Sequence, residues 1–285
     1  MIALDRISSR AFLVCVALCA ALSPGAVRAE EYGTVPDTVR FRSGWMFADF
    51  NTEAQVGIQD SSRGTDLNFE DIFNLPVSKG SLRLEGGWRF KPKHHLDLGY
   101  VSFDRTAARD IDRDIDFGDT TFLVGARVTA TIDSQFIYAA YRYDFIRAER
   151  LRFSGSAGLS WLTMSAGLSA TGNFTGPGGS GSGSGSQEAG ISFPVPLFGL
   201  ALEGDISKRI IGSVYARGLW LSSGDLKGVY LESGIAADWY FTRNFGMGLG
   251  YDLTSIHIEG ANDGDLQAEF DYSFHGPRVF LSFAF

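Results

Sequence analysis

From about residue 38 onward, apolar and polar side chains alternate instead of recurring every three or four positions. Between residues 82 and 90, for example, Leu82 and Trp88 share one phase, and Arg83 and Arg89 share the other. In an extended strand, successive side chains point to opposite faces, so a period of two indicates strands with one apolar and one polar face. The same alternation recurs in later segments, and the sequence therefore predicts an all-β protein.

The connections between the alternating segments are by turns short and long. Short ones lie at 91–94, 147–150, 207–209 and 242–244, and longer ones at 56–79, 109–130, 171–191 and 259–267. Residues 122–130 also alternate, so the fourth strand could start early and rise beyond the membrane. The phase then slips near 133–135, which indicates a bulge or a loop there, so eight or twelve strands remain possible. Residues 68–75 leave room for a helical turn. The preferred count is ten strands, near 38–55, 80–91, 94–108, 131–146, 149–170, 192–207, 210–221, 227–241, 244–258 and 268–285.

Two architectures bury such strands. In a soluble sandwich the apolar phase faces a core, whereas in a membrane barrel it faces lipid and the polar phase lines the lumen. Aromatic residues gather toward predicted strand ends, as at Trp88, Phe90, Trp239 and Phe241, which is typical of girdles at membrane interfaces. With the alternation of short and long connections, this favours a transmembrane antiparallel up-and-down β-barrel.

The last predicted strand carries an apolar face that ends on an aromatic residue. Val279, Leu281, Phe283 and Phe285 occupy alternate positions. An exposed strand edge of this kind invites aggregation, and closing the sheet into a barrel removes the edge. The pattern resembles the ending of bacterial outer-membrane β-barrels. In that family the barrel-assembly machinery reads this ending, which implies that machinery as a partner.

The N-terminal residues have the features of a secretion signal. Arg6 and Arg10 precede an apolar run at 11–22, which is too short to span a bilayer as a helix, and small residues follow. We expect residues 1–29 to be a cleaved signal peptide and residues 30–285 to form one barrel domain. Cys15 and Cys19 both lie in the signal, so no disulfide or cysteine metal site is expected in the mature chain. The Gly/Ser-rich stretch at about 176–187 is expected to be a flexible loop.

Charge separates some functional classes from others. The formal net charge is −8, which argues against nucleic acid as a partner. Many charges fall on the phase expected to face a narrow lumen, where arginines and carboxylates from opposite walls would meet. We expect them to form a structural plug of ion pairs, and the alternative is a narrow pore for small solutes. This lumen charge network comprises Arg83, Glu85, Arg89, Asp97, Arg142, Asp144, Arg152, Glu203, Asp205, Arg217, Glu232, Asp238, Asp252 and Arg278.

Residues 110–116 carry four aspartates at alternate positions. Carboxylates of this kind can bind Ca²⁺, but the usual twelve-residue loop with its central Gly and terminal Glu is absent. A solvated acidic loop is therefore expected, and neither a metal site nor a cofactor is predicted.

Ten strands also resemble the omptins, outer-membrane proteases in which an Asp pair faces an Asp–His pair at the outer rim. Asp110 and Asp112 match the first pair, but His257 is followed by Glu259 in inverted order and lies on the ninth strand. Lipid A-modifying barrels use a His near a Ser or Glu, and His257 lies close to Ser255 in sequence. Neither spacing is specific, so no catalytic residue is predicted.

The mature chain as a whole resembles the porin-like, outer-membrane protein A-like barrel superfamily. The resemblance implies residence in the cell outer membrane among lipids and lipopolysaccharide, as a monomer. Fold alone does not give function. We expect a structural or surface-interaction protein with a charge-plugged lumen. The alternatives are a narrow porin-like channel and, third, an outer-membrane enzyme.

Overall fold

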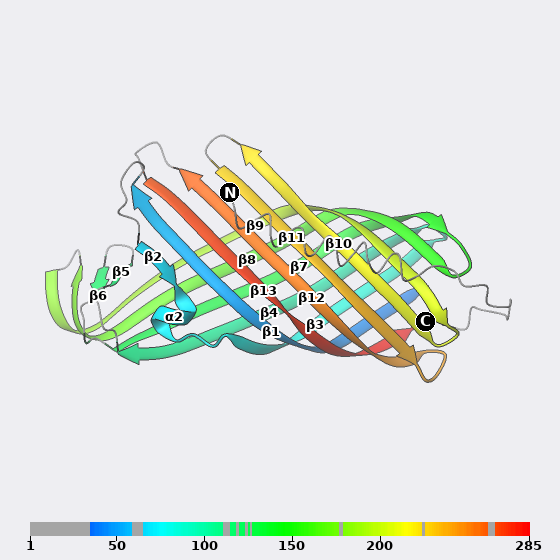
Figure 1. Ribbon diagram of the computed structural model, residues 1–285, viewed down its shortest axis with the longest axis horizontal. Coiled ribbons are helices and arrows are strands. Elements are labelled where there is room, and N and C mark those ends of the chain that lie inside the picture. Colours follow the sequence, from blue (N-terminus) through cyan, green and yellow to red (C-terminus); the bar gives the residue numbers. More distant parts are fainter. Residues whose placement is uncertain are drawn as a thin grey trace.

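The computed structural model of the chain is a closed barrel of ten long antiparallel strands (Figure 1). It describes residues 35–58, 65–110, 115–117, 120–122, 125, 127–176, 179–223, 226–261 and 266–285; the expected signal peptide lies outside them. None of the helices in these ranges is long and apolar enough to cross a membrane. The long strands are β1 (Val39–Ile58), β3 (Ser78–Lys91), β4 (His94–Asp110), β7 (Arg127–Arg147), β8 (Leu151–Gly176), β9 (Gly179–Ser207), β10 (Ile210–Ser223), β11 (Leu226–Tyr240), β12 (Phe245–Ala261) and β13 (Leu266–Ala284).

Each long strand pairs with its neighbours in the chain, and the barrel closes between the first strand and the last. β1 pairs with β13 from Arg40↔Ala284 to Ile58↔Leu266, so the C-terminal strand has no free edge along this length. The expected all-β, up-and-down, ten-stranded barrel is therefore confirmed, and eight- and twelve-stranded barrels are excluded. The four connections expected to be short, at 91–94, 147–150, 207–209 and 242–244, all lie at one end of the barrel, here called the turn end, and the opposite end is the loop end.

Two local expectations are corrected. The expected break near 133–135 does not occur, because β7 and β4 pair without interruption from Asp110↔Arg127 to His94↔Tyr143. The Gly/Ser-rich stretch at 176–187, expected as a loop, is strand almost throughout, since β8 and β9 pair as far as Gly176↔Gly179. Short strands β5 (Ile115–Phe117) and β6 (Thr120–Phe122) extend the loop end beside β8.

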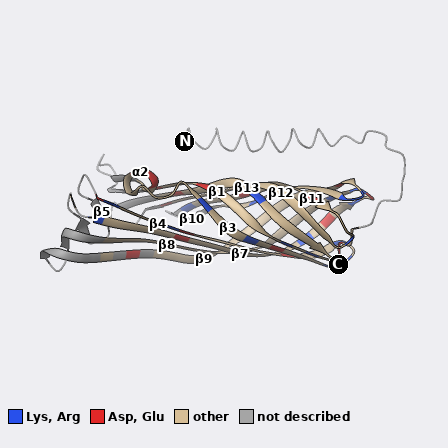
Figure 2. Cartoon of the chain, turned by 90° about the horizontal axis from the view of Figure 1, so that it is seen from below, with Lys and Arg blue, Asp and Glu red and all other residues tan. Residues whose placement is uncertain are grey.

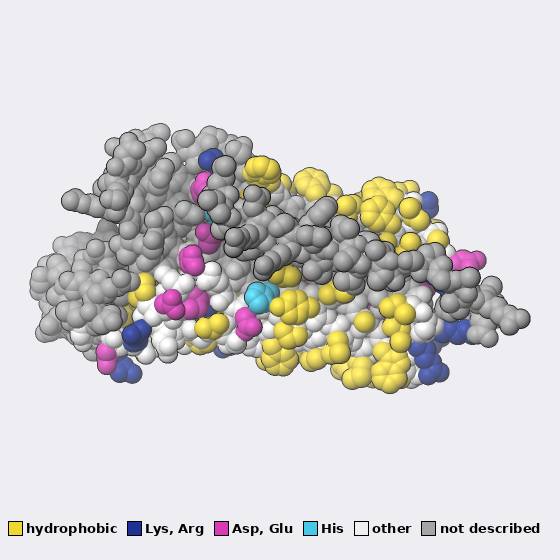
Figure 3. Space-filling view, viewed as in Figure 1, with side chains coloured by type: hydrophobic (Ala, Val, Ile, Leu, Met, Phe, Trp, Pro, Cys, Tyr) yellow, Lys and Arg dark blue, Asp and Glu magenta, His cyan; other side chains and the backbone are white. Residues whose placement is uncertain are grey.

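An apolar belt surrounds the half of the barrel nearer the turn end. On β12 the outward side chains Met247, Leu249 and Leu253 are exposed, and on the neighbouring β13 Val279 and Leu281 are exposed as well. In the space-filling view, hydrophobic side chains gather over this half (Figure 3). Membrane-spanning barrels carry an outward apolar band of this kind, about 25 Å tall.

Beyond the belt the outward side chains become polar on strand after strand. On β1 Phe47 is followed by Asp49 in the outward phase, and on β12 Leu253 is followed by Ser255 and His257. The strands continue well past this boundary: β8 has 26 residues and β9 has 29, whereas about 9–11 residues cross a bilayer. The barrel therefore projects beyond the membrane at its loop end.

Inside the projecting half the lumen is apolar. Phe50, Phe103, Phe136, Tyr272 and Phe274, here called the aromatic seal, come from β1, β4, β7 and β13 and are all buried. The ring centroids of Phe50 and Phe103 are 5.0 Å apart, as are those of Phe103 and Phe274. Aliphatic side chains of β7, β8 and β9 pack around them. The apolar phase of a strand thus faces outward within the membrane and inward beyond it.

A short helix, α2 (Phe69–Phe73), closes one interval of the wall. The ladder between β3 and β4 ends at Arg83↔Val101, although β4 continues to Asp110 and β1 to Ile58. The short strand β2 (Thr65–Asn68) pairs with the outer part of β1, and α2 follows it at the loop end between β1 and β4 (Figure 1). The Asn68 side chain caps α2 by accepting from the Asp71 N–H at 2.9 Å. Asn74 ends the helix in the left-handed region, at φ 56°.

Candidate functional site

The lumen at membrane level contains a network of arginines and carboxylates. Arg83 on β3 reaches across to β11, where its Nη2 donates to Glu232 Oε1 at 2.9 Å. Arg217 on β10 donates to the same carboxylate from Nε and Nη2, at 2.9 and 2.8 Å. Its guanidinium also lies 3.6 Å from the centroid of the Tyr138 ring. Two arginines from different walls therefore share one buried carboxylate, an arrangement that holds the walls together.

The same layer continues around the barrel through β1 and β13. Arg278 lies between Glu85 and Asp252, at 2.8 Å from each. Arg42 donates to both oxygens of Asp238, at 3.0 and 2.6 Å. Together with Arg83, Arg217, Glu232 and Tyr215, these residues form what is called here the mid-lumen network. Figure 2 marks charged positions along the strands in blue and red.

A second cluster lies at the turn end. Arg142 pairs with Asp97 at 2.6 Å, and the His95 ring bonds Asp144 at 3.0 Å. Arg152 is paired with both Glu203 and Asp205. With Arg40, Arg89, Arg147 and Asp37, these residues are called here the turn-end cluster.

The segment before β1 crosses this end of the lumen. Val35 packs against Ile211, Tyr240 and Ala284 on one side, while Asp37 bonds arginines on the other. Burial opposes ionisation of Asp37, but the hydrogen bonds from Arg147 and Arg89 outweigh that effect, and the pKa of Asp37 is lowered. The partners of Asp37 come from three strands and are Arg89, Arg147 and Arg152.

Alternation along the strands locates the lumen charges but misses some of their partners. The inward phase of β1 contains Arg40 and Arg42, and the alternation of Val39, Phe41 and Ser43 with them was the available signal. Asp37 precedes the first strand and carried no such signal, whereas His95 shares the inward phase of Asp97 on β4. In the structure each of the fourteen expected lumen residues makes an ion pair: Arg83, Glu85, Arg89, Asp97, Arg142, Asp144, Arg152, Glu203, Asp205, Arg217, Glu232, Asp238, Asp252 and Arg278.

Toward the loop end, one buried arginine fastens α2 to the wall. Arg105 on β4 is 1% exposed, and its Nη1 lies 2.5 Å from Glu70 Oε1 of α2. The other Glu70 oxygen accepts the backbone N–H of Thr52, at 3.0 Å, where β1 lacks a strand partner on that side. The Arg105 guanidinium is also 4.2 Å from the centroid of the Phe50 ring. Arg105 shares the inward phase of Asp97 on β4, but no pattern in the sequence indicates that it pairs with Glu70.

The C-terminal aromatic signature lies on the lipid-facing side. Val279, Leu281 and Phe285 are exposed, and the Phe283 ring lies 5.0 Å from that of Phe245 on β12. The opposite phase, which includes Arg278 and Phe280, is buried in the lumen.

The residues considered for catalysis are not brought together among the described residues. Asp110 ends β4 and His257 lies on β12, with β3, β1 and β13 between them in the wall. Both belong to the outward phase of their strands, whereas Asp112 lies outside the described residues. His257 instead contacts Asp271 at 2.7 Å and Glu259 at 3.0 Å. Within the described ranges, no group of three or more His, Cys, Asp or Glu side chains is arranged to hold a metal.

Comparison with known proteins shows similarity of structure but not of sequence. No protein-family model matches the chain, and no curated protein matches it. The outer-membrane protease OmpT of Escherichia coli superposes with a TM-score of 0.52 and 10% identity, covering 91% of this chain and 100% of OmpT. OprG of Pseudomonas aeruginosa gives 0.37 and 10%, over 88% and 98% of the two chains. The toluene transporter TodX of Pseudomonas putida gives 0.36 and 9%, over 88% and 91%.

The closed ten-stranded barrel, its apolar belt and its polar projecting half define the class of the protein. It is a bacterial outer-membrane β-barrel. The chain is accordingly an integral protein of the cell outer membrane, and in barrels of this class the short turns face the periplasm and the longer loops face outward. At 10% identity, the likeness to OmpT concerns the fold alone.

Proposed function

We propose that this protein is a non-conducting structural barrel that presents a surface outside the cell. The observation that carries the proposal is the occupation of the lumen by two successive layers. The turn-side layer consists of ion pairs, and the loop-side layer is the aromatic seal with α2 fastened over one side of it.

The two layers oppose ion passage for different physical reasons. An ion crossing the aromatic seal would lose its hydration without finding polar partners, which costs many kcal/mol in an apolar surrounding. Within the mid-lumen network the side chains are bonded to one another across the lumen, so an opening requires several pairs to separate together. Between the two layers, among Arg83, Tyr138, Phe136 and Phe274, the space is only about 10 Å³.

The projecting half supports the surface role. Its outward side chains include Asp49, Asp104, Asp133 and Asp271, which lie just beyond the belt at the level of lipopolysaccharide head groups. A rigid wall of paired strands is a suitable platform for contacts with other molecules, because it loses little entropy on binding. In this proposal the belt contacts outer-membrane lipids, and lipopolysaccharide surrounds the aspartates just beyond it. The assembly machinery reads the C-terminal strand, and the barrel acts as a monomer.

Ionic current across planar bilayers tests the proposal. The folded wild-type barrel should give no steady single-channel current. Phe103→Ala with Phe274→Ala removes two adjacent rings of the aromatic seal, and we expect occasional brief openings at most while the mid-lumen network remains. A matched control removes two belt residues, Leu249→Ala with Leu281→Ala, and should stay silent.

A stable, ion-selective current through the wild-type barrel would reject the proposal and favour the narrow channel.

A further inference from the structure

A polar chamber of about 160 Å³ lies in the lumen on the turn side of the mid-lumen network. It exists because several inward positions in its wall are small. Ser156, Ala201 and Ser213 are inward on the adjacent strands β8, β9 and β10, and Gly87 is inward on β3. The volume corresponds to roughly five water molecules at about 30 Å³ each. This space is therefore large enough for a small solute and too small for a peptide or a nucleotide.

The chamber wall is rich in cationic groups. Five arginines line it, namely Arg40, Arg42, Arg142, Arg152 and Arg217. Four carboxylates line it as well, namely Asp37, Glu85, Asp97 and Glu203. With all of these ionised, the wall carries one net positive charge.

Hydrogen-bond capacity is unbalanced in the same direction. Each guanidinium has five N–H donors and each carboxylate about four lone-pair sites, so the arginines bring about 25 donors against about 16 acceptor sites. Both sets are also shared with partners outside the wall: Asp37 bonds Arg89 and Arg147 and Glu85 bonds Arg83 and Arg278, while Arg42 bonds Asp238, Arg217 bonds Glu232 and Arg152 bonds Asp205.

Two individual donor atoms in the wall lack an acceptor. Arg40 Nε and Arg152 Nε are buried and have no hydrogen-bond acceptor among the described residues. Both arginines already use their terminal nitrogens on Glu203. Buried donors without acceptors are uncommon in folded proteins and point to a missing acceptor nearby.

We propose that the chamber is a binding site for a small oxyanion, a carboxylate or phosphate, that enters from the turn end. An oxyanion supplies only acceptors and one or two negative charges, which suit a wall lined by five guanidinium groups with two Nε donors that lack an acceptor. A small cation would add further donors beside these groups. The segment from Val35 to Asp37 crosses the entrance. This inference goes beyond the proposed structural role, because binding in a chamber below a closed seal requires no transport.

Calorimetric titration of the full mature barrel, folded in detergent, tests the site. The buffer is HEPES without added chloride, and the probes are inorganic phosphate, acetate and, as a cation of similar size, ethanolammonium. Either anion, or both, should bind saturably with a Kd of about 1 mM or tighter, and the cation should not. Ser156→Leu and Ser213→Leu fill the chamber without removing a charge, and each should weaken anion binding at least about tenfold. Ser165→Leu, on the outward phase of the same strand as Ser156, is the matched control and should leave it unchanged.

Failure of both anions to bind would overturn the proposal, as would equal binding of ethanolammonium or unchanged affinity in the two chamber variants. The anion-to-cation comparison uses the wild-type protein alone, so it decides the matter even if a variant does not fold. The absence of ionic current across a bilayer would not affect the calorimetric result. The anion site and the proposed structural role can therefore be rejected independently of each other.

Discussion

Arg217 distinguishes a structural lumen from a conducting one. Its side chain makes two hydrogen bonds to Glu232 and covers the ring of Tyr138. Arg217→Leu leaves Glu232, which is itself buried, with Arg83 as its remaining cationic partner. Breaking a buried pair in this way costs about 3–5 kcal/mol. We therefore expect a marked fall in the free energy of unfolding, measured with urea in detergent.

Arg142→Leu is the comparison, because Arg142 and Asp97 have side chains 17% and 22% exposed. Loss of that pair should cost less, about 1–3 kcal/mol. Unchanged stability in both variants, together with altered ion selectivity, would show that the arginines serve a pore.

Asp37 gives a prediction that depends on pH. Because its pKa is lower in the folded protein than the usual 3.8, the bonds to its arginines stabilise the fold fully above that value. The contribution is lost as the pH falls through the lower, folded pKa. Asp37→Ala should therefore destabilise by about 1–3 kcal/mol at pH 7, and the difference from wild type should shrink below pH 3.8. Urea unfolding of both proteins at pH 7 and pH 3 measures it. A difference that is the same at both pH values would exclude an ionised Asp37 as the anchor.

Alternation in the sequence was sufficient to place charged side chains such as Arg83 and Glu232 in the lumen, because a period of two assigns each strand residue to one face. It was not sufficient to pair them. Partners such as Arg217 and Glu232 meet only after the register between β10 and β11 is set, and Asp37 precedes the first strand.

At the scale of single elements, the ion pair between Glu70 and Arg105 fastens α2 across an interval without a backbone ladder. Glu70→Ala leaves the fully buried Arg105 without its carboxylate, which should cost about 3–5 kcal/mol. Adding Arg105→Met removes the uncompensated charge, so the double variant should be more stable than Glu70→Ala alone. Unfolding free energies of the two single variants and the double variant measure this coupling.

If the double variant is less stable than Glu70→Ala by the full cost of Arg105→Met, the two residues do not act as a pair. Phe73→Ala is a separate check on the packing of the helix, because a deleted buried Phe costs about 3–5 kcal/mol.

The strands themselves show why the break near residue 134 was expected. Val128, Ala130 and Ile132 are apolar in the inward phase of β7, whereas Ile137 and Tyr141 are apolar in the outward phase. If all of these apolar residues are assigned to one face of the strand, the alternation shows a change of phase near residue 134. The pairing of β7 with β4 continues without a break across residues 133–135. The apolar residues of β7 move from the inward to the outward phase because the lumen is apolar above the membrane and charged within it.

At 176–187 the glycines and serines led to a predicted loop where the structure has strands. Their composition indicates a flexible loop, but the paired backbone of β8 and β9 continues through that stretch. Backbone pairing does not require large side chains once both strands are already aligned by the membrane-spanning part.

At the scale of the whole molecule, the belt and the projecting half should respond differently to a charge. Leu249 is 66% exposed on the belt, and Leu249→Arg should destabilise the barrel by about 2–4 kcal/mol near the midplane. Gln135→Arg, on the outward phase of β7 near the polar boundary, should change stability little. Reversible unfolding in lipid vesicles compares them. Equal costs would mean that the belt is not in contact with lipid hydrocarbon.

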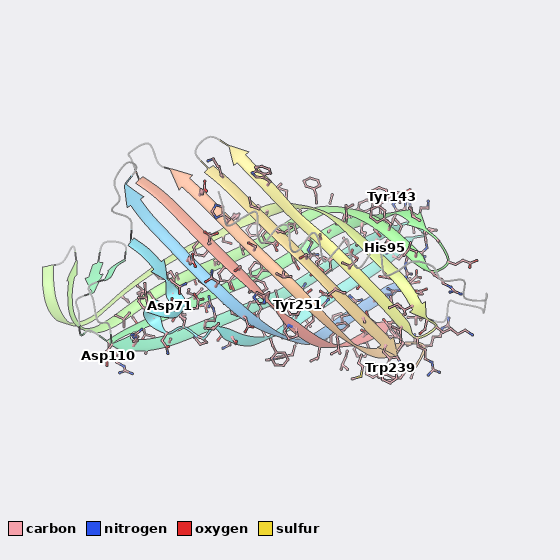
Figure 4. All side chains as sticks on the ribbon, viewed as in Figure 1. Asp71, His95, Asp110, Tyr143, Trp239 and Tyr251 are labelled. Carbon is pink, nitrogen blue, oxygen red and sulfur yellow. The ribbon has the colours of Figure 1, made fainter. Side chains whose placement is uncertain are left out.

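The apolar belt, the strand count and the closure followed from the sequence because they depend on local periodicity. The length of the projecting half was indicated only for the fourth strand, by the alternation of residues 122–130, because strand residues beyond the membrane keep the same period and do not mark where the membrane ends. Its apolar lumen and the position of α2 emerge only when non-adjacent strands such as β1, β4 and β13 meet. The labels in Figure 4 show the two ends of this arrangement, with Asp71 and Asp110 at the loop end and His95 and Trp239 at the turn end.

The central claim is that lipid covers only the turn-side half of the barrel, while the same strands continue into water with their apolar faces turned inward. Nitroxide labels on single cysteines at Leu249, Leu281, His257 and Asp271, in the protein folded in vesicles, test it by electron paramagnetic resonance. Labels at Leu249 and Leu281 should be relaxed strongly by oxygen and weakly by a polar nickel chelate, and those at His257 and Asp271 should show the reverse. Oxygen-dominated relaxation at all four positions would contradict this account of the fold.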